Sequence, residues 1–321
     1  MTTNTIAQFT AADVPSQAGR RILITGANSG IGFEAALELA RRGAEIILPA
    51  RSLEKANDAI ARIRRAIPNA KLTPAILDLA SLSSIKQFAT EVATRFPGQS
   101  LDLLINNAGV MAVPNRELTV DGYERQFATN YLGPFLLTAL LYPHLKQEQG
   151  ARIVTLASGV ANQAKIEFDN LQSERVYKPM FGAYSQSKLA DLIFQQELQR
   201  RLTAARSPIL STGAHPGYAI TNLQTSGPAG QTPLIFRIVS TLLKPWASQD
   251  AAHGALPTLF AATSPAAGPG GYYGPHKFQE LIGFPVPAKI VPAAKDLNLA
   301  KRLWSETERL VGVTFTLQGV S

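Results

Sequence analysis

Short apolar runs alternate along the chain with longer stretches whose apolar residues recur at helical spacing. The apolar runs have strand composition and lie at 22–24, 46–48, 72–77, 101–105, 153–156 and 209–210, with a candidate seventh near 271–273. Between two of them, Ile31, Ala35 and Leu39 form a helical stripe. Buried runs separated by helices predict a single α/β, doubly wound sheet of seven parallel strands, with helices on both faces.

Three segments depart from this alternation. Residues 1–19 lack a basic start and an apolar centre, so we expect a flexible tail or an early edge segment rather than a signal peptide. The main domain is then 20–315. Residues 218–249 contain an amphipathic helical stripe, which we interpret as a substrate lid; surface packing and attachment to a membrane surface are the alternatives. Residues 265–287 are dense in Pro and Gly, and a last helix is predicted near 296–310.

Composition narrows the chemistry. The chain has no cysteine, which excludes disulfides, thiolate nucleophiles and cysteine-ligated metals. No two of its four histidines have metal-ligand spacing on a helix, so no metal site is expected.

The net charge of +8 suits a solvated basic surface or attraction for an anionic ligand such as a cofactor phosphate. The basic clusters are short, which disfavours a nucleic-acid partner. Apolar stretches fall short of the roughly 20 residues that a spanning helix needs, so we expect no integral membrane segment and a cytoplasmic protein.

A glycine-rich turn, TGANSGIG at 25–32, connects the first strand to the first helix. Glycine permits the tight turn and a close approach of the backbone to a phosphate, and the helix N-terminus presents N–H groups and a positive dipole to a pyrophosphate. The pattern predicts a dinucleotide site. Its predicted contacts are Gly26, Asn28, Ser29, Gly30, Ile31 and Gly32.

The end of the second strand indicates which dinucleotide is bound. This chain has Arg51 there and no acid that would accept from a ribose 2′-hydroxyl. An arginine can pair with a 2′-phosphate, so NADP(H) is predicted over NAD(H). The alternative is that Arg51 is only an exposed arginine at the start of a helix.

Two further strand ends are predicted to contact the cofactor. Asp78, with Leu79, follows the third strand and can accept from an adenine amino group; alternatively Asp78 caps the next helix, a role for which Ser81 competes. Asn107, Ala108 and Gly109 follow the fourth strand, where small residues let the chain pass close to the cofactor.

The spacing Tyr-x-x-x-Lys occurs three times, beginning at Tyr142, Tyr184 and Tyr273. The tyrosine and lysine of such a pair share one helical face, and the ammonium favours the phenolate form needed for proton transfer to a carbonyl or alcohol oxygen. Tyr142 precedes a proline at the end of a helix, and Tyr273 precedes Gly-Pro, which predicts a turn. Only Tyr184 and Lys188 lie in a continuous helical pattern after a strand that ends in a serine, Ser158.

Six motifs occur in a fixed order: TGANSGIG at 25–32, NNAG at 106–109, ATNYLGPF at 128–135, Ser158, YSQSK at 184–188 and HPG at 215–217. Over residues 20–310 the chain therefore resembles the short-chain dehydrogenase/reductase superfamily, especially the branch around retinol dehydrogenases, whose cofactor is often NADP. The resemblance implies a single Rossmann fold.

It also implies a catalytic tetrad of Asn130, Ser158, Tyr184 and Lys188. In that tetrad Ser158 holds the substrate oxygen, Asn130 holds a water in the proton relay, and Lys188 also contacts the cofactor ribose. Pro216, Gly217 and Thr221 would contact the nicotinamide end of the cofactor.

The predicted function is that of an NADP(H)-dependent carbonyl reductase or alcohol dehydrogenase. Hydride would pass between the nicotinamide and a hydrophobic ketone, aldehyde or secondary alcohol, with Tyr184 as general acid and base. The alternative is a non-catalytic NADP(H)-binding sensor on the same fold. The resemblance further implies a homodimer or homotetramer formed through helices around 117–146 and 183–206, although monomers occur in the family.

Overall fold

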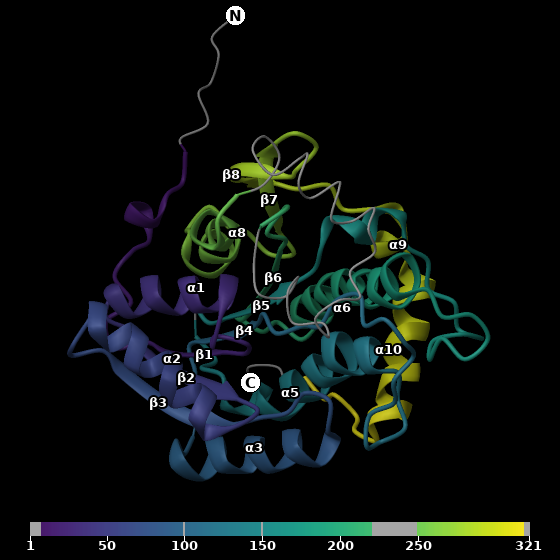
Figure 1. The fold of residues 1–321 in the computed structure, drawn as a ribbon, viewed down its shortest axis with the longest axis horizontal. Coiled ribbons are helices and arrows are strands. Elements are labelled where there is room, and N and C mark those ends of the chain that lie inside the picture. The colour runs from purple at the N-terminus through teal and green to yellow at the C-terminus, as the bar shows by residue number, and fades with distance from the viewer. Residues whose placement is uncertain (1–7, 99, 149, 220–248, 318–321) are drawn as a thin grey trace, which may run out of the picture.

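The computed structural model describes residues 8–98, 100–148, 150–219 and 249–317, which fold around one eight-stranded sheet (Figure 1). The strand order is β3-β2-β1-β4-β5-β6-β7-β8, and every neighbouring pair is parallel except β7 and β8. The strands are β1 (Arg21–Ile24), β2 (Glu45–Ala50), β3 (Lys71–Ile76), β4 (Leu103–Asn106), β5 (Arg152–Leu156), β6 (Leu210–Ala214), β7 (Tyr272–Lys277) and β8 (Ile282–Pro287). The order reverses between β1 and β4, and open α/β sheets bind their ligands at such a point.

Helices cover both faces of the sheet, as predicted. One face carries α1 (Gly30–Arg41), α2 (Leu53–Ala66) and α8 (Ala251–Thr263). The other carries α3 (Leu82–Arg95), α5 (Gly133–Leu141), α6 (Ser185–Ala204) and α10 (Leu297–Val311); α4 (Arg125–Phe127) and α9 (Pro292–Lys295) are short.

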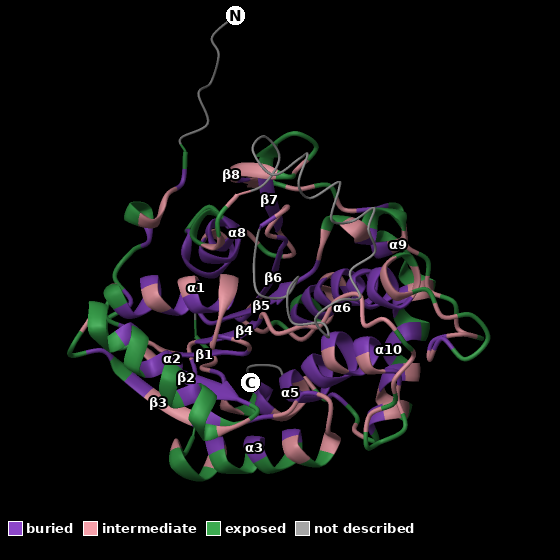
Figure 2. Cartoon of the chain, viewed as in Figure 1, coloured by how far each residue is buried: buried purple, intermediate pink, exposed green. Residues whose placement is uncertain are grey.

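Successive strand residues enter the two cores alternately. Ile22 and Ile24 pack with α1, α2 and α8, whereas Leu23 packs with the helices of the opposite face. The central strands are therefore buried on both sides, as Figure 2 shows, whereas the edge strands β3 and β8 are only partly buried. This double burial explains why the strands are continuous apolar runs instead of alternating ones.

The prediction of seven strands is one short, because β8 adds an antiparallel edge strand. Its sequence, IGFPVP, combines glycine and proline, which reads as loop. Proline is tolerated there because an edge strand leaves one side of its backbone unpaired. The candidate strand near 271–273 is confirmed as β7, but the turn predicted from Gly274-Pro275 is wrong, because β7 continues to Lys277; Tyr273 and Lys277 therefore share no helical face.

The prediction of a flexible tail is wrong for residues 8–19. Phe9 is 8% exposed and meets the Phe260 ring of α8 edge-on, with centroids 5.1 Å apart. The buried Gln17 donates its backbone N–H to the carbonyl of Arg42 at 2.8 Å, and the Arg42 guanidinium donates to the carbonyl of Ala11. Residues 8–19 are thus docked on the sheet's α1 and α8 side, and residues 1–7 lie outside the described part.

Most of the predicted lid, 220–248, also lies outside the described residues, so the interpretations of 218–249 stay predictions. The predicted last helix is confirmed as α10, which Asp296 caps by accepting from the backbone N–H groups of Asn298 and Leu299. In the described part of the chain, none of the helices has the length and apolar character required to cross a bilayer.

Docking of the N-terminal segment predicts that Phe9→Ala lowers the free energy of unfolding by about 3 kcal/mol, because it removes a buried ring and leaves a cavity against α8. Urea unfolding followed by circular dichroism measures the change. The matched control is Gln8→Ala, which alters the exposed neighbour and should stay within about 0.5 kcal/mol of the parent. Equal stability of all three proteins would mean that this segment does not pack.

Candidate active site

A hollow of about 740 Å³ lies at the carboxyl ends of the central strands, where the strand order reverses. The chain segments at the carboxyl ends of β1 to β6 contribute to it, together with the start of α6. Most of the predicted cofactor contacts line it: Gly26, Asn28, Ser29, Gly30, Ile31, Gly32, Arg51, Asp78, Leu79, Asn107, Ala108, Gly109, Lys188 and Pro216. The fold therefore brings together residues that the sequence separates by almost 200 positions.

The glycine turn is packed directly against the segment after β4. A Cβ placed on Gly32 would lie 2.3 Å from Asn107 Nδ2, and one on Gly26 would lie 2.8 Å from Ala108 Cα. Thr25 Oγ1 accepts from the backbone N–H groups of Asn107 and Ala108, both at 3.0 Å. Side chains at these two glycines would push the turn away from its neighbour, so glycine is required by contact as well as by the positive φ of Gly26.

The N-terminus of α1 opens onto this hollow. Ser29 holds the N-cap position, but its hydroxyl makes no capping hydrogen bond, so it does not take up the first-turn N–H groups. Thr129 also lines the hollow, and its buried hydroxyl has no hydrogen-bond partner among the described residues. Unused donors at a positive helix end suit a phosphate, so the residues present fit a dinucleotide.

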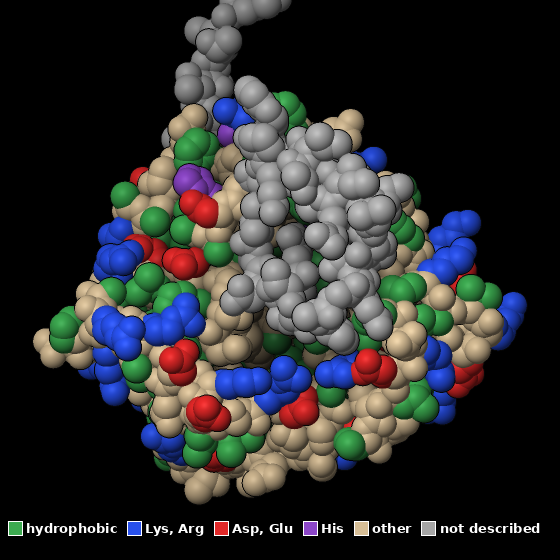
Figure 3. All heavy atoms as spheres, viewed as in Figure 1, with side chains coloured by type: hydrophobic (Ala, Val, Ile, Leu, Met, Phe, Trp, Pro, Cys, Tyr) green, Lys and Arg blue, Asp and Glu red, His purple; other side chains and the backbone are tan. Residues whose placement is uncertain are grey.

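The charges of the lining are mainly positive. Among the described residues that line the hollow, Arg51, Lys55, Arg125 and Lys188 are cationic, and Asp78 is the one carboxylate. Elsewhere on the described part of the face in Figure 3, basic side chains are interspersed with acidic ones. The hollow therefore carries the same sign of charge as the whole chain, and this positive charge favours an anionic ligand.

Of the two candidate caps for the helix after β3, Asp78 and Ser81, it is Ser81 that caps the helix. Ser81 Oγ accepts from the backbone N–H of Ser84 at the start of α3, whereas Asp78 Oδ1 accepts from the backbone N–H of Ala80 at 2.9 Å. Asp78 thus braces the loop while it lines the hollow.

Tyr184 and Lys188 lie at the beginning of α6. Tyr184 ends a π-helical turn, η5 (Pro179–Tyr184), and is 6% exposed; Lys188, in the first turn of α6, is 5% exposed. Both line the hollow. Lys188 Nζ donates to the carbonyl oxygen of Leu156 and to Asp191 Oδ2, each at 2.9 Å.

The pKa of Lys188 reflects opposing effects. Burial disfavours the ammonium form, but the carboxylate of Asp191 and the nearby Tyr184 oxygen outweigh it, so the pKa of Lys188 is raised. Burial likewise raises the pKa of Asp191, although the Lys188 ammonium acts in the other direction. The pair is therefore a buried ammonium–carboxylate contact directly behind the tyrosine.

Asn130 lies in a second π-helical turn, η2 (Ala128–Leu132), between α4 and α5. Its Oδ1 accepts from the Val110 backbone N–H at 2.7 Å, and its Nδ2 donates to the Val110 carbonyl and to Ser187 Oγ, both at 2.9 Å. Pro134 has no N–H, so the ordinary helical bond to the Asn130 carbonyl oxygen cannot form. Asn130 thus joins the β4 loop to α6 but does not line the hollow.

Gly109 lies close to both Asn130 and Lys188. A Cβ on Gly109 would lie 3.2 Å from Asn130 Oδ1 and 3.7 Å from Lys188 Nζ. Three predicted site residues from three elements therefore meet at one point.

The remaining predicted residues have mixed outcomes. Ser158 lies two residues after the end of β5 and caps the short helix η4 (Gly159–Gln163), accepting from the Val160 backbone N–H, and it is outside the hollow's lining. Gly217, with φ +64°, also lies outside the lining, and a Cβ on it would lie 2.2 Å from the Leu281 carbonyl oxygen. Thr221 lies outside the described residues.

His215 directly follows β6 and forms hydrogen bonds at the end of that strand. Its Nε2 contacts Glu280 Oε2 at 3.0 Å, while its Nδ1 accepts from the Gly217 backbone N–H. The hydrogen bond from His215 holds the pKa of Glu280 below its usual range. His215 therefore ties the loop after β6 to the hairpin of β7 and β8.

Sequence reasoning missed several residues of this site. Ser187 donates to the Tyr184 carbonyl at 2.8 Å and accepts from Asn130. Lys55 adds a second cation beside Arg51, and Arg62 stacks on the Phe33 ring and donates to the Asn28 carbonyl. Asp191 was missed as well. Helical spacing is the signal that could have indicated these residues: Ser187 lies three positions after Tyr184, Asp191 three after Lys188, and Lys55 four after Arg51.

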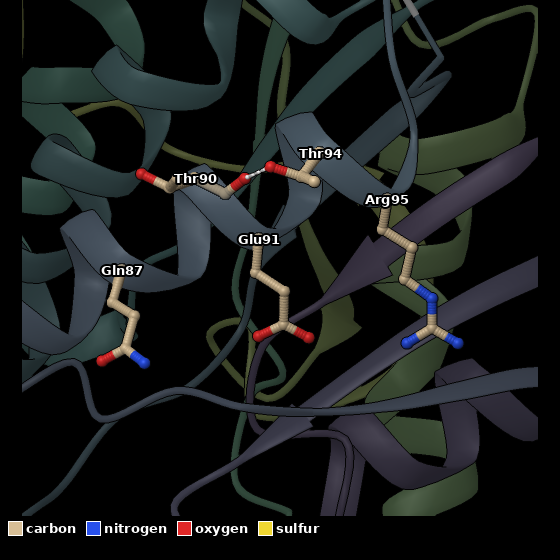
Figure 4. Close-up of a pocket in the computed structure, with 5 residues that line it drawn as sticks. All are labelled: Gln87, Thr90, Glu91, Thr94 and Arg95. Atoms are coloured by element: carbon tan, nitrogen blue, oxygen red, sulfur yellow. Dashed lines mark hydrogen bonds between the residues drawn. The ribbon is translucent and has the colours of Figure 1, made fainter.

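A second hollow, of about 600 Å³, lies on the outer face of α3 (Figure 4). Its side chains, Gln87, Thr90, Glu91, Thr94 and Arg95, come from one helix, and Thr94 donates to its own helix at the Thr90 carbonyl. Because no second element supplies converging groups, this surface depression is a poor candidate for a ligand site.

Comparisons with known proteins agree with this geometry. The family model for short chain dehydrogenase matches residues 20–231. Human retinol dehydrogenase 13 is 40% identical over 315 residues, covering 95% of this chain and 89% of that protein.

Two solved structures show the same fold. The crystal structure of an uncharacterized protein from Mycobacterium paratuberculosis is 39% identical, covers 97% of this chain and 100% of that chain, and superposes with a TM-score of 0.78. That of a short chain dehydrogenase from Burkholderia cenocepacia J2315 in complex with NADP is 25% identical, covers 80% of this chain and 96% of that chain, and has a TM-score of 0.61.

The matched family, the extent of the similarity to retinol dehydrogenase 13 and the shared fold lead to one conclusion. The chain belongs to the short-chain dehydrogenase/reductase superfamily, in its retinol dehydrogenase-like branch, and is a nicotinamide-dependent oxidoreductase.

Proposed function

We propose that this protein is an NADP(H)-dependent oxidoreductase that interconverts a hydrophobic carbonyl compound and its alcohol, with Tyr184 as general acid and base. The observation that carries the proposal is that Tyr184 and Lys188 line the same hollow as the glycine turn. A group held by the turn and a proton donor on α6 therefore share one continuous space.

NADP(H) is favoured by the residues at the end of β2. Arg51 and Lys55 both line the hollow, and no carboxylate follows β2 within it. Two cations can neutralise a 2′-phosphate, whereas a ribose 2′-hydroxyl would be recognised by an acid. The similar Burkholderia structure, which is in complex with NADP, adds support.

Residues of the chain would donate and accept the proton. When bound, the nicotinamide supplies or accepts the hydride. In carbonyl reduction, the Tyr184 hydroxyl gives its proton to the substrate oxygen as the carbon is reduced, and alcohol oxidation reverses this transfer. The buried Lys188 ammonium stabilises the phenolate that forms.

Ser158 and Asn130 would assist from the adjoining elements. Ser158, at the carboxyl end of β5, has a hydroxyl that can hold the substrate oxygen. The Asn130 carbonyl, which Pro134 leaves without its usual helical donor, can hold a water that passes protons to Lys188.

A hydrophobic substrate is supported by the segment between β5 and α6. Phe181, within the turn η5, is 69% exposed, and Val176 is also exposed. Two other aromatic side chains of this segment are engaged elsewhere: Phe168 lies under the Arg302 guanidinium and Tyr177 donates to the Val113 carbonyl. Retinol, named for the relative, is an apolar alcohol of the proposed class. The oligomeric state and the cytoplasmic location stay predictions.

Replacing Tyr184 by Phe should lower kcat/KM for NADPH-dependent reduction by about 10²- to 10⁴-fold, because the variant has no proton to give the substrate oxygen. NADPH binding, measured by fluorescence titration, should change little. Tyr142→Phe is the matched control, since Tyr142 belongs to another Tyr-x-x-x-Lys pair and lies outside the hollow's lining; it should retain activity.

Full reductase activity in Tyr184→Phe would contradict the assignment of the proton donor. A parent protein that binds NADPH but turns over no member of a broad panel of ketones, aldehydes and alcohols would instead indicate the non-catalytic sensor.

Replacing Arg51 by Asp should lower the preference for NADPH over NADH by about 10- to 100-fold, because a cation for the 2′-phosphate becomes a carboxylate that repels it. Dissociation constants for both cofactors measure the change. Arg64→Asp makes the same charge change at an exposed α2 position outside the lining and should leave the preference unchanged. An unaltered preference in Arg51→Asp would refute the proposed recognition of the phosphate.

A further inference from the structure

A carboxylate lies directly behind the proposed proton-transfer pair, and the proposed mechanism does not use it. Asp191 is 1% exposed and lies three residues after Lys188 on α6. Its Oδ2 accepts from Lys188 Nζ at 2.9 Å, and its buried Oδ1 has no hydrogen-bond partner among the described residues. Burying a carboxylate with only one partner is costly, so packing alone does not account for Asp191.

Among the described residues, Lys188 is the one counter-ion of Asp191. The other titratable groups in that part of the chain that interact with Asp191 are Tyr131 of the π turn η2 and Tyr272 of β7. Burial raises the pKa of both tyrosines, and Asp191 adds to this effect, so both stay neutral. Tyr184 is the other titratable group close to the Lys188 ammonium.

Among the described residues, Glu280 reaches this cluster through Tyr272. The Glu280 carboxylate helps to raise the pKa of Tyr272, and it contacts His215, whose ring lies 5.3 Å from that of Tyr272. The Asp191 carboxylate therefore interacts mainly with the Lys188 ammonium.

The Lys188 ammonium in turn requires a counter-charge. Its ammonium is buried, and its one other hydrogen-bond acceptor among the described residues is the neutral carbonyl of Leu156. A buried ammonium without a counter-charge tends to lose its proton. A neutral lysine would no longer stabilise a phenolate at Tyr184.

We propose that Asp191 is a positioning residue for the reaction: it holds the Lys188 side chain in place and keeps it cationic, and it thereby sets the upper pH limit of catalysis. This inference rests on the proposed roles of Tyr184 and Lys188. Asp191 itself touches neither the hollow nor a reacting atom.

The direction of the pH effect follows from the charges. Reduction requires protonated Tyr184 together with cationic Lys188. Removing the adjacent negative charge makes this coupled pair release its first proton at lower pH, whichever of the two residues loses it. The alkaline limb of the pH profile for reduction should therefore move to lower pH.

The test uses Asp191→Asn in the full-length chain, because asparagine keeps the size of the side chain and an oxygen that can accept from Lys188. We expect the alkaline limb of kcat/KM for reduction to move by about one pH unit to lower pH. The control is Glu197→Gln, which removes another buried, ion-paired carboxylate of α6, roughly 9 Å further along the helix than Asp191. Its profile should match that of the parent.

A second readout needs no substrate. In protein labelled with ¹³C-lysine, the Cε chemical shift of Lys188, assigned with Lys188→Arg, reports the ionisation of its amine. In Asp191→Asn this ionisation should occur at least about one pH unit lower than in the parent, and Glu197→Gln should leave it unchanged.

The two readouts separate the inference from the function on which it rests. Unchanged Lys188 ionisation in Asp191→Asn, or a shift to higher pH, would overturn the inference, even if the protein proves to be an active reductase. A shift to lower pH in a protein that reduces no carbonyl would support the contact with Asp191 and refute the proposed function. Circular dichroism of each variant verifies that it is folded.

Discussion

The proposed mechanism depends on keeping one buried ammonium group charged. Lys188 is buried, and the free energy of its desolvation is offset by groups from separate parts of the fold: the carbonyl of Leu156 at the end of β5 and the carboxylate of Asp191 on α6. Gly109, after β4, lies close to both Lys188 and Asn130 of the π turn. Strand ends and helix starts must therefore hold their positions closely, which a sheet buried on both faces achieves.

The hollow also depends on chain segments that pack closely at the carboxyl ends of the strands. The glycine turn can lie against the segment after β4 because Gly26 and Gly32 have no side chains, and the threonine hydroxyl of Thr25 binds that segment's N–H groups. The turn thus places a positive helix end opposite the start of α6. Proton chemistry on one side and phosphate recognition on the other are linked by backbone packing rather than by a flexible domain.

The periodicity of the sequence predicted the parallel core well, because central strands are apolar throughout and their flanking helices are striped. The periodicity did not predict the edge strand β8 or the docking of residues 8–19. The edge strand β8 tolerates the prolines and glycine that indicate a loop, and the segment 8–19 is polar in composition although Phe9 and Gln17 are buried by docking.

In the site, motif order identified Tyr184, Lys188 and the glycine turn, since each has its own local pattern. For Asp191 and Ser187 the sequence offers only helical spacing from Lys188 and Tyr184: their importance comes from contacts with Lys188 and Asn130, and the contact with Asn130 joins segments far apart in the sequence. The central claim is that these contacts place a proton donor beside a hydride carrier. Its most direct test is to supply NADPH deuterated at the transferring C4 position with a panel of hydrophobic ketones and aldehydes, and to analyse the products by mass spectrometry. The account predicts an alcohol with one deuterium on the carbon that bears the hydroxyl. NADPH binding without deuterium transfer to any carbonyl of the panel would contradict it.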